Sequence, residues 1–529
     1  MTQEIYDAVI VGCGFGGIYQ LYRLRKLGLK CVAIDQAGGV GGTWYWNLYP
    51  GAMSDTESYV YRYSWDTEDL AEYPWPEKYV KQPEVLAYLN HVADRHDLRK
   101  DTRFNTQLSR ADWIDATQTW KIATSGSDTP IVAKYLVTCL GLLSTQNIPD
   151  IPGLKYFAGE LYHTGKWPQG VTLENKRVGI IGSGSTGVQV ITEIASNEAS
   201  VPSGDAKVTP EERQEINDNY DAIWHRVRNS ITAFGFEEST ISYHSVSPEQ
   251  RERIFQENWD KGNGFRYMFG TFKEITTDSE ANEGACDFIR QKIRDIVKDP
   301  EKARKLQPHD VYARRPLCDG NASNGQKYFE QFNRDNVDIV DLREISIETI
   351  EAGGIKTSDG KLHELDVLIL ATGGRMLAWR FIPHPTTLQE EWKDGPTSAL
   401  GIFVPNHPNF FMVNGAKGPF TNQPPAIEAE VDFVADTIER AEQSGTRLVE
   451  VLPEGEQEWA KLCEQLAADS LFHKAQENWI FGANIPGKKR CLRFYFGGMQ
   501  GYLKELDKCV SSDYPGFRPF NQHAIAASS

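Results

Sequence analysis

The 529-residue chain has few cysteines, no excess of positive charge and no long hydrophobic segment. Its eight cysteines include no C-x-x-C pair, which argues against a disulfide framework, a zinc site or a dithiol redox centre. The formal net charge of −17 argues against binding to nucleic acid or to an anionic membrane, because both require basic surfaces. We therefore expect a reduced cytoplasmic protein that binds small molecules and no metal.

No apolar run approaches the roughly 20 residues that a membrane-spanning helix needs. The first residues also lack the basic and then apolar segments of an export signal. We expect neither export nor membrane anchoring. The chain is longer than one hydrophobic core usually supports, so several domains are expected. We also expect a monomer or weak homo-oligomer.

Two glycine motifs of the dinucleotide-binding type stand out. The first comprises Gly12, Gly14 and Gly17. It follows a buried strand expected over 5–11, and a second strand expected over 29–34 ends at Asp35. From Gly17 to Asp35 is 35 − 17 = 18 positions, close to the ~20 at which an acidic residue accepts the ribose hydroxyls. A carboxylate there repels a 2′-phosphate, so this site suits FAD or NAD.

The residues after Asp35 favour FAD. Segments 41–46 and 49–52 combine glycines, which allow close backbone approach, with large aromatic rings, as an extended flavin nucleotide would use. Trp44 and Trp46 have the alternative interpretation of ordinary core aromatics. For Trp46, the flavin-contact and the core interpretations are equally open.

The second glycine motif follows a strand expected over 178–181 and precedes a helix expected from Val188. It comprises Gly182, Ser183, Gly184, Ser185, Thr186 and Gly187. The start of that helix can bind a pyrophosphate through backbone N–H groups. A second strand should then bring a residue that selects NAD or NADP, but segment 196–210 has the composition of a loop.

The remaining pattern predicts how the two units connect. Segment 211–310 is charged and has helical spacing over 288–297, which indicates a helical insertion. A strand expected over 366–370 leads to a turn at 371–374 that is typical of a crossing between nucleotide domains, and a strand over 135–141 has the same shape. A strand over 409–413 returns the chain to the first domain. We predict an α/β fold with two Rossmann-like dinucleotide-binding domains and a helical insertion.

The segment between the glycine motifs carries a longer signature. The pattern F-x-G-x-x-x-H-x-x-x-W-P of the type I Baeyer–Villiger monooxygenases is matched by Phe157, Gly159, His163, Trp167 and Pro168. Segments 42–47, 54–58, 315–319 and 479–489 also resemble this family, most of all the cyclohexanone monooxygenases. The resemblance covers nearly the whole chain.

The resemblance implies an FAD- and NADPH-dependent monooxygenase. NADPH would reduce FAD, O2 would form a flavin peroxide, and the peroxide would convert a ketone such as cyclohexanone to a lactone or ester. Arg315 would stabilise the peroxide anion, because a guanidinium keeps its proton, and Asp55 would orient Arg315. Two alternatives stay open: a related flavin monooxygenase that acts on nitrogen or sulfur, and a flavin-binding protein with impaired NADPH-dependent turnover.

Matching motifs also imply binding residues. Positions that line FAD in the family correspond to Phe15, Asp35, Thr43, Trp44, Asp55, Tyr61 and Gln423. Positions around the nicotinamide nucleotide correspond to Gly182 to Gly187, Arg314, Arg315 and Trp479. Trp479 belongs to a lid segment near 474–491. For His163 a hydrogen-bonded hinge is preferred over proton transfer, because the family signature lies in a linker.

The expected domains follow from these assignments. The FAD-binding domain comprises 1–146 and 385–529, the linker and NADP-binding domain 147–210 and 311–384, and the helical insertion 211–310. Three segments depart from the family pattern, namely 196–210, 320–327 and 374–379. The first lacks the strand and the basic pair that hold the 2′-phosphate, so we expect weaker selectivity for NADPH over NADH than in relatives. The ring size and stereochemical preference of the ketone stay open.

Overall fold

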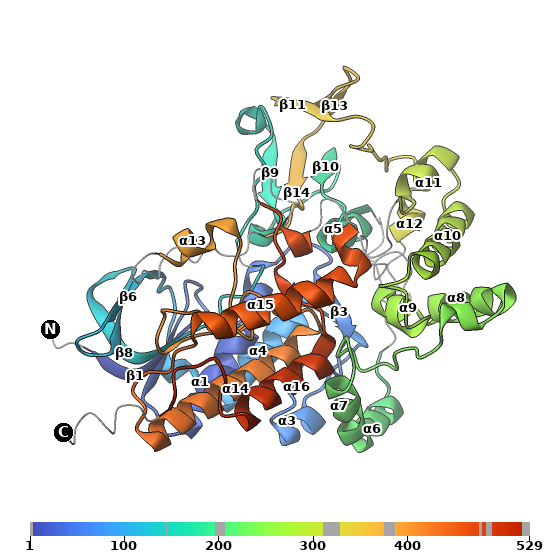
Figure 1. Cartoon of the computed structure of the whole chain (residues 1–529). Coiled ribbons are helices and arrows are strands. Elements are labelled where there is room, and N and C mark those ends of the chain that lie inside the picture. Colours follow the sequence, from blue (N-terminus) through green and yellow to red (C-terminus); the bar gives the residue numbers. More distant parts are fainter. Residues whose placement is uncertain are drawn as a thin grey trace, which may run out of the picture.

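A computed structural model describes residues 4–143, 145–195, 207–309, 328–374, 387–474, 479–482 and 489–520. Figure 1 shows two sheet-centred units, with a group of helices on one side. Among the described residues, no helix has the length and apolar character needed to span a bilayer.

The largest sheet contains the first glycine motif. Its strands are β1 (Ile5–Val11), β2 (Cys31–Ile34), β5 (Thr102–Arg103), β6 (Leu108–Ile114), β7 (Thr119–Thr124), β8 (Ser127–Thr138) and β15 (Phe410–Met412). The order is β5-β2-β1-β8-β7-β6, with β15 also paired to β8. Strands β5, β2, β1, β8 and β15 are parallel, and β6 and β7 add an antiparallel extension. The strands predicted over 5–11 and 29–34 are confirmed as β1 and β2, the latter two residues shorter at its start.

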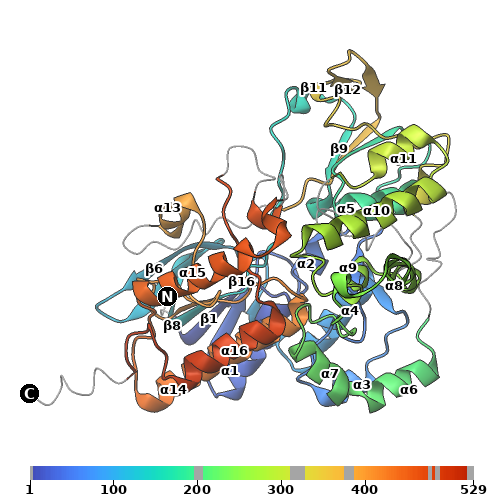
Figure 2. The ribbon, with the colours of Figure 1, turned by 45° about the vertical axis from the view of Figure 1, so that its right-hand side comes forward.

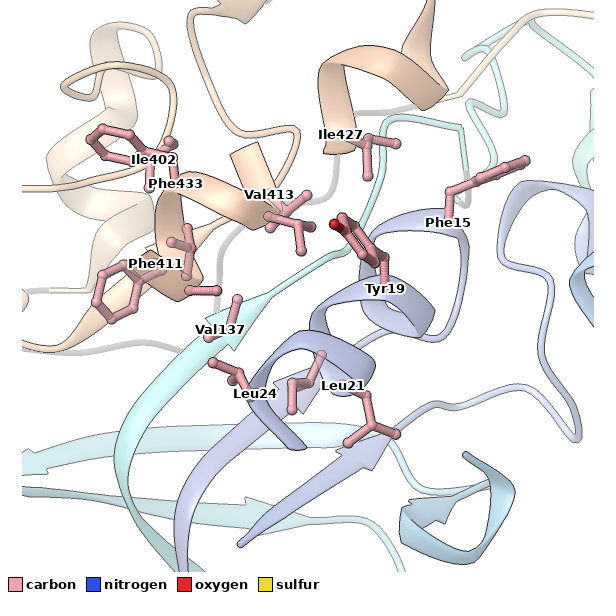
Figure 3. Close-up of a cluster of buried hydrophobic side chains, with 14 of the residues drawn as sticks. Phe15, Tyr19, Leu21, Leu24, Val137, Ile402, Phe411, Val413, Ile427 and Phe433 are labelled. Carbon is pink, nitrogen blue, oxygen red and sulfur yellow. The ribbon is translucent and has the colours of Figure 1, made fainter. Parts of the chain in front are cut away.

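The helices of this unit come from both ends of the chain. They are α1 (Phe15–Lys26), α2 (Thr43–Trp46), α3 (Thr67–Glu72), α4 (Gln82–Arg95), α13 (Leu388–Glu391), α14 (Gln423–Ser444), α15 (Pro453–Ala468) and α16 (Gly498–Ser511). Figure 3 shows Leu24 of α1, Val137 of β8 and Phe411 of β15 in one buried cluster. The predicted return of the chain near 409–413 is confirmed, because β15 pairs in parallel with β8.

The second unit is a smaller parallel sheet that contains the second glycine motif. Its order is β10 (Val178–Ile181), β14 (Val367–Leu370), β9 (Glu160–His163), and α5 (Ser185–Ala195) follows β10. The predicted strand over 178–181 is confirmed, and the helix begins at Ser185 rather than Val188. An antiparallel sheet of β11 (Ile347–Glu351), β12 (Gly354–Thr357) and β13 (Leu362–Glu364) extends outward (Figure 1). Two short strand pairs complete the sheets: β3 (Met53–Glu57) with β4 (Tyr79–Lys81), and β16 (Gly418–Pro419) with β17 (Phe494–Tyr495).

The helical spacing predicted over 288–297 is confirmed by α10. The helices of this region are α6 (Pro210–Asp218), α7 (Tyr220–Arg228), α8 (Pro248–Lys261), α9 (Gly264–Gly270), α10 (Ser279–Ile296), α11 (Pro300–Leu306) and α12 (Tyr328–Gln331). Thr209 and Ser247 begin α6 and α8 with capping boxes, which satisfy N–H groups at the helix starts. Figure 2 shows these helices together beside the two sheets.

Candidate active site

One large cavity lies where the two sheet-centred units meet. Its volume is about 2410 Å³, and residues of both glycine motifs line it. Small-molecule pockets usually measure about 300–1,000 Å³, so this cavity has room for two dinucleotides. The two nucleotide sites therefore open into a common space.

The first glycine turn requires glycine for steric reasons. Gly12 has φ +102°, and a Cβ there would lie 2.4 Å from Cys139 O. A Cβ on Gly17 would lie 1.7 Å from Gly12 O, so Gly17 lets α1 start directly against its own loop. Gly12 and Gly14 line the cavity, which leaves the start of α1 open to a ligand.

Asp35 lies at the end of β2, beside this loop. Its carboxylate accepts hydrogen bonds from Cys13 N at 2.6 Å and from Ala37 N at 2.8 Å. Burial raises the pKa of Asp35, although the two backbone bonds oppose that shift. The residue lines the cavity, and each carboxylate oxygen retains a lone pair for a ribose hydroxyl.

Aromatic side chains form a wall next to the turn. Trp44 Nε1 donates to Tyr61 Oη at 3.2 Å, and the Phe15 ring meets the Tyr61 ring edge-on at 5.6 Å. These three residues line the cavity together with Thr43 at the start of α2. Trp46 is half-buried and also lines the cavity, which favours a ligand contact over a core position.

Gln423 at the start of α14 also faces this space. Its Nε2 donates to Thr421 O at 3.0 Å, whereas its Oε1 is buried without a hydrogen-bond partner. A buried acceptor without a donor costs free energy, so this atom suits the N–H of a bound ring. Together with the glycine turn and Asp35, it fits FAD.

The second glycine turn repeats the geometry of the first. Gly182 has φ +126°, and a Cβ there would lie 2.2 Å from Ala371 O. A Cβ on Gly187 would lie 2.2 Å from Gly182 O, whereas one on Gly184 would meet nothing within 4 Å. Ser183, Ser185 and Thr186 line the cavity, as do Gly182 and Gly184. The start of α5 is therefore suited to a second pyrophosphate.

Asp55 of β3 is bound by a side chain from the second unit. Gln189 of α5 donates from Nε2 to Asp55 Oδ1 at 3.4 Å and to Met53 O at 3.3 Å. The Gln189 Oε1 accepts from Tyr49 Oη at 2.9 Å, and Asn263 Nδ2 donates to Asp55 O at 3.0 Å. Sequence analysis missed Gln189 and Asn263, although Gln189 stands between Val188 and Val190 on a buried helix, where an amide is unusual.

His163 joins the two crossings between the units. Its Nδ1 accepts from Gly165 N at 3.0 Å, so the neutral tautomer donates from Nε2 to Asn147 O at 3.3 Å. Thr372 Oγ1 donates to the same Asn147 oxygen at 2.6 Å, and Asn147 N donates to Gly373 O at 3.0 Å. Burial lowers the pKa of His163. This geometry supports the hinge interpretation of His163.

Three other signature residues pack within the second unit. Trp167 is buried against Val190, Val367 and Ile369, and a Cβ on Gly159 would lie 2.4 Å from Asp366 O. Phe157 packs on a small cluster with Leu368 and Leu370. Of the five signature residues, all described, only His163 lines the cavity.

Several predicted features lie outside the described residues. They are Arg314, Arg315 and most of the three segments that depart from the family pattern. Trp479 begins a short 3-10 helix, Trp479–Phe481, and for Trp479 only the backbone is described.

The two nucleotide turns, the shared cavity and the flavin-compatible wall define a flavoprotein oxidoreductase with two dinucleotide sites. A family model described as flavin-binding monooxygenase-like matches residues 7–204. A Baeyer–Villiger monooxygenase of Pseudooceanicola batsensis is 46% identical over 96% of this chain and 95% of its own length. A phenazine N-monooxygenase of Lysobacter antibioticus is 45% identical over 97% and 96%.

Solved structures agree with these relatives. A cyclohexanone monooxygenase of Rhodococcus sp. Phi1 bound to NADP+ superposes with a TM-score of 0.92 at 47% identity, covering 98% of this chain and 99% of that one. The chain belongs to the Baeyer–Villiger monooxygenases, a flavin-binding family. The predicted family and fold class are confirmed.

Proposed function

We propose that the chain catalyses the NADPH-dependent Baeyer–Villiger oxygenation of cyclic ketones to lactones. The reaction consumes a ketone, O2, NADPH and a proton, and yields a lactone, water and NADP+. The observation that carries this proposal is the single cavity that both glycine turns and Asp55 share. Such a cavity would let the reductant and the ketone both reach one bound flavin.

Each part of the cavity has a role in this reaction. FAD, when bound, supplies hydride acceptance from NADPH and oxygen transfer to the ketone. The first glycine turn would hold its pyrophosphate, Asp35 its ribose, and Gln423 Oε1 would accept from its ring system. The start of α5 would hold the pyrophosphate of NADPH. Gln189 and Asn263 hold Asp55, the carboxylate to which the family resemblance gives the role of orienting Arg315.

The proposed domain assignment rests on strand pairings. Residues 1–146 and 385–529 form the FAD-binding domain, supported by the pairing of β15 with β8. Residues 147–210 and 311–384 form the linker and NADP-binding domain, supported by the parallel sheet of β10, β14 and β9. The helices between them form the insertion 211–310.

The visible spectrum of the purified protein tests the activity. Addition of NADPH without oxygen should bleach the flavin, and oxygen with cyclohexanone should restore the colour and yield caprolactone. Flavin that stays oxidised with NADPH would contradict the proposal. It would instead favour the flavin-binding protein with impaired turnover.

The Arg315→Ala variant tests the oxygen-transfer step. We expect bound FAD and NADPH-dependent flavin reduction to persist, while lactone formation falls at least ~10²-fold, because a fixed cation that stabilises the transition state is lost. Lactone is quantified by gas chromatography. Arg110→Ala is a suitable control, since Arg110 is exposed and pairs with Asp112 outside the cavity. Lactone formation at the native rate in Arg315→Ala would contradict the mechanism.

A second candidate function is oxygenation of a ring nitrogen. The 45% identity to a phenazine N-monooxygenase favours it. Phenazine and cyclohexanone should be compared as substrates of the same preparation. N-oxide formation that survives Arg315→Ala, without lactone from cyclohexanone, would establish this alternative.

A further inference from the structure

Arg493 is a buried cation with unused hydrogen-bond donors. Arg493 is only 2% exposed, and both Nε and Nη2 are buried without a hydrogen-bond partner. Arg493 directly precedes β17, where its carbonyl oxygen accepts from Lys417 N at 2.7 Å. Lys417, the partner in this backbone bond, also carries a positive charge and so cannot neutralise the guanidinium.

The fold leaves space for this guanidinium at Gly482. A Cβ at position 482 would lie 2.0 Å from Arg493 Nη2 and 2.5 Å from its Cζ. Gly482 also has φ +68°, a conformation that favours glycine. The close approach places the backbone of segment 479–482 over one face of the guanidinium.

Arg493 lines the common cavity together with several aromatic side chains. The Phe420 and Phe494 rings lie 5.3 Å apart, and Phe472 stacks on Phe496 at 5.5 Å. All four rings line the cavity together with Arg493. An apolar setting makes a charged donor without a partner costly, so an anion there would be bound strongly.

We propose that Arg493 is a carboxylate-binding subsite at the substrate end of the cavity, so that the substrates include ketones that carry a carboxylate. Nε–H and Nη2–H form one edge of the guanidinium and point in parallel, which matches the two oxygens of a carboxylate. The aromatic side chains then contact the carbon ring of the substrate. This inference rests on the proposed ketone oxygenation. A phosphate of the coenzyme offers the same oxyanion chemistry, and the NADPH-to-NADH preference of Arg493→Met distinguishes it from a carboxylate.

The test compares a keto acid with a neutral analogue. The FAD-loaded enzyme is assayed with 4-oxocyclohexanecarboxylate and with its methyl ester, and kcat/KM is measured for each. Arg493→Met preserves side-chain length without charge, and Lys417→Met is the matched control. We expect the acid-to-ester ratio of kcat/KM to fall at least about tenfold in Arg493→Met. In Lys417→Met the ratio should stay within about twofold. An equal ratio in wild type and Arg493→Met overturns the subsite.

Two further measurements separate the remaining explanations. Titration of the oxidised enzyme with the keto acid, followed by the flavin absorbance, reports binding without turnover. Saturable binding that is lost in Arg493→Met supports the subsite even where no ketone is oxygenated, which would reject only the proposed function. If Arg493→Met changes the NADPH-to-NADH preference instead, the anion belongs to the coenzyme and the substrate assignment is overturned.

Arg493→Lys is a second test variant, in case Arg493→Met misfolds. It keeps the charge but loses the parallel pair of donors, so the keto-acid ratio should lie between those of wild type and Arg493→Met. The keto acid should also raise the melting temperature of the wild type more than that of Arg493→Met. A keto-acid ratio in Arg493→Lys at or above the wild-type value contradicts recognition by the paired donors.

Discussion

Two buried glutamates on α14 hold protons that an exposed carboxyl would lose. Burial raises the pKa of Glu430 to about 8, and burial raises the pKa of Glu428 to about 7. Glu430 Oε2 accepts from Asn414 N at 2.5 Å, and its Oε1 lies 3.2 Å from Tyr502 Oη, which donates to Leu400 O at 2.6 Å. A protonated Glu430 can therefore donate to the Tyr502 oxygen.

The Glu430→Gln variant should make stability less dependent on pH. The folded pKa exceeds the unfolded value of ~4.3, so the folded state holds a proton that the unfolded state has lost between these two values. Stability contributed by Glu430 therefore falls as pH rises from ~4.3 to about 8. Its limiting slope is ~1.4 kcal/mol per pH unit. Gln has the shape of the neutral acid and removes this slope.

Urea unfolding midpoints between pH 5 and 9 check this prediction. Glu439→Gln is the control, because Glu439 lies on the same helix but is only half-buried. The wild type and Glu439→Gln should both lose stability toward pH 8, whereas Glu430→Gln should lose less. Parallel curves for all three proteins would show that Glu430 is ionised in the fold.

At the scale of elements, each nucleotide site depends on the close contact between a helix start and its own loop. Gly17 and Gly187 do not line the cavity, although they belong to the glycine motifs. Their role is to let α1 and α5 begin against Gly12 O and Gly182 O. The helix starts then point their free N–H groups into the cavity.

Gly17→Ala should weaken FAD binding at least ~10-fold, because its Cβ would overlap Gly12 O and the helix start must move away from the loop. FAD affinity is measured by titrating the apoprotein with FAD. Gly353→Ala is the control, since a Cβ at Gly353 meets nothing within 4 Å. Native FAD affinity in Gly17→Ala would refute the steric argument.

At the scale of the whole molecule, the chain crosses between its two nucleotide units twice. Both crossings are joined at one point, where Asn147 of the first bonds to Thr372 and Gly373 of the second. An isolated antiparallel bridge between Gln146 and Gly374 adds to this link. His163 closes the network from β9. These hydrogen bonds near the cavity therefore help to set the relative position of the two units.

Thr372→Val should slow the reduction of FAD by NADPH ~10-fold while FAD stays bound. The valine removes the hydroxyl that donates to Asn147 O, so the two units hold their productive position less tightly. Stopped-flow absorbance of the flavin measures the rate. Thr357→Val is the control, because it removes the same hydroxyl at a buried threonine that bonds within the small antiparallel sheet. Equal reduction rates in both variants would argue against the hinge.

The sequence by itself determined the strands, the glycine turns and the family. Strands such as β1 and β2 could be predicted because burial on both faces leaves a continuous apolar run, and the turns because φ near +100° favours glycine. These signals are local, so neighbouring residues suffice to read them.

Only the tertiary structure decided which side chains meet in the cavity. Gln189 reaches Asp55 across 134 positions of sequence, and Thr372 reaches Asn147 across 225. Arg493 looks like a surface residue in the sequence, since arginine is seldom fully buried. Its burial beneath Gly482 follows from how distant segments pack, and that packing depends on contacts that no local pattern contains.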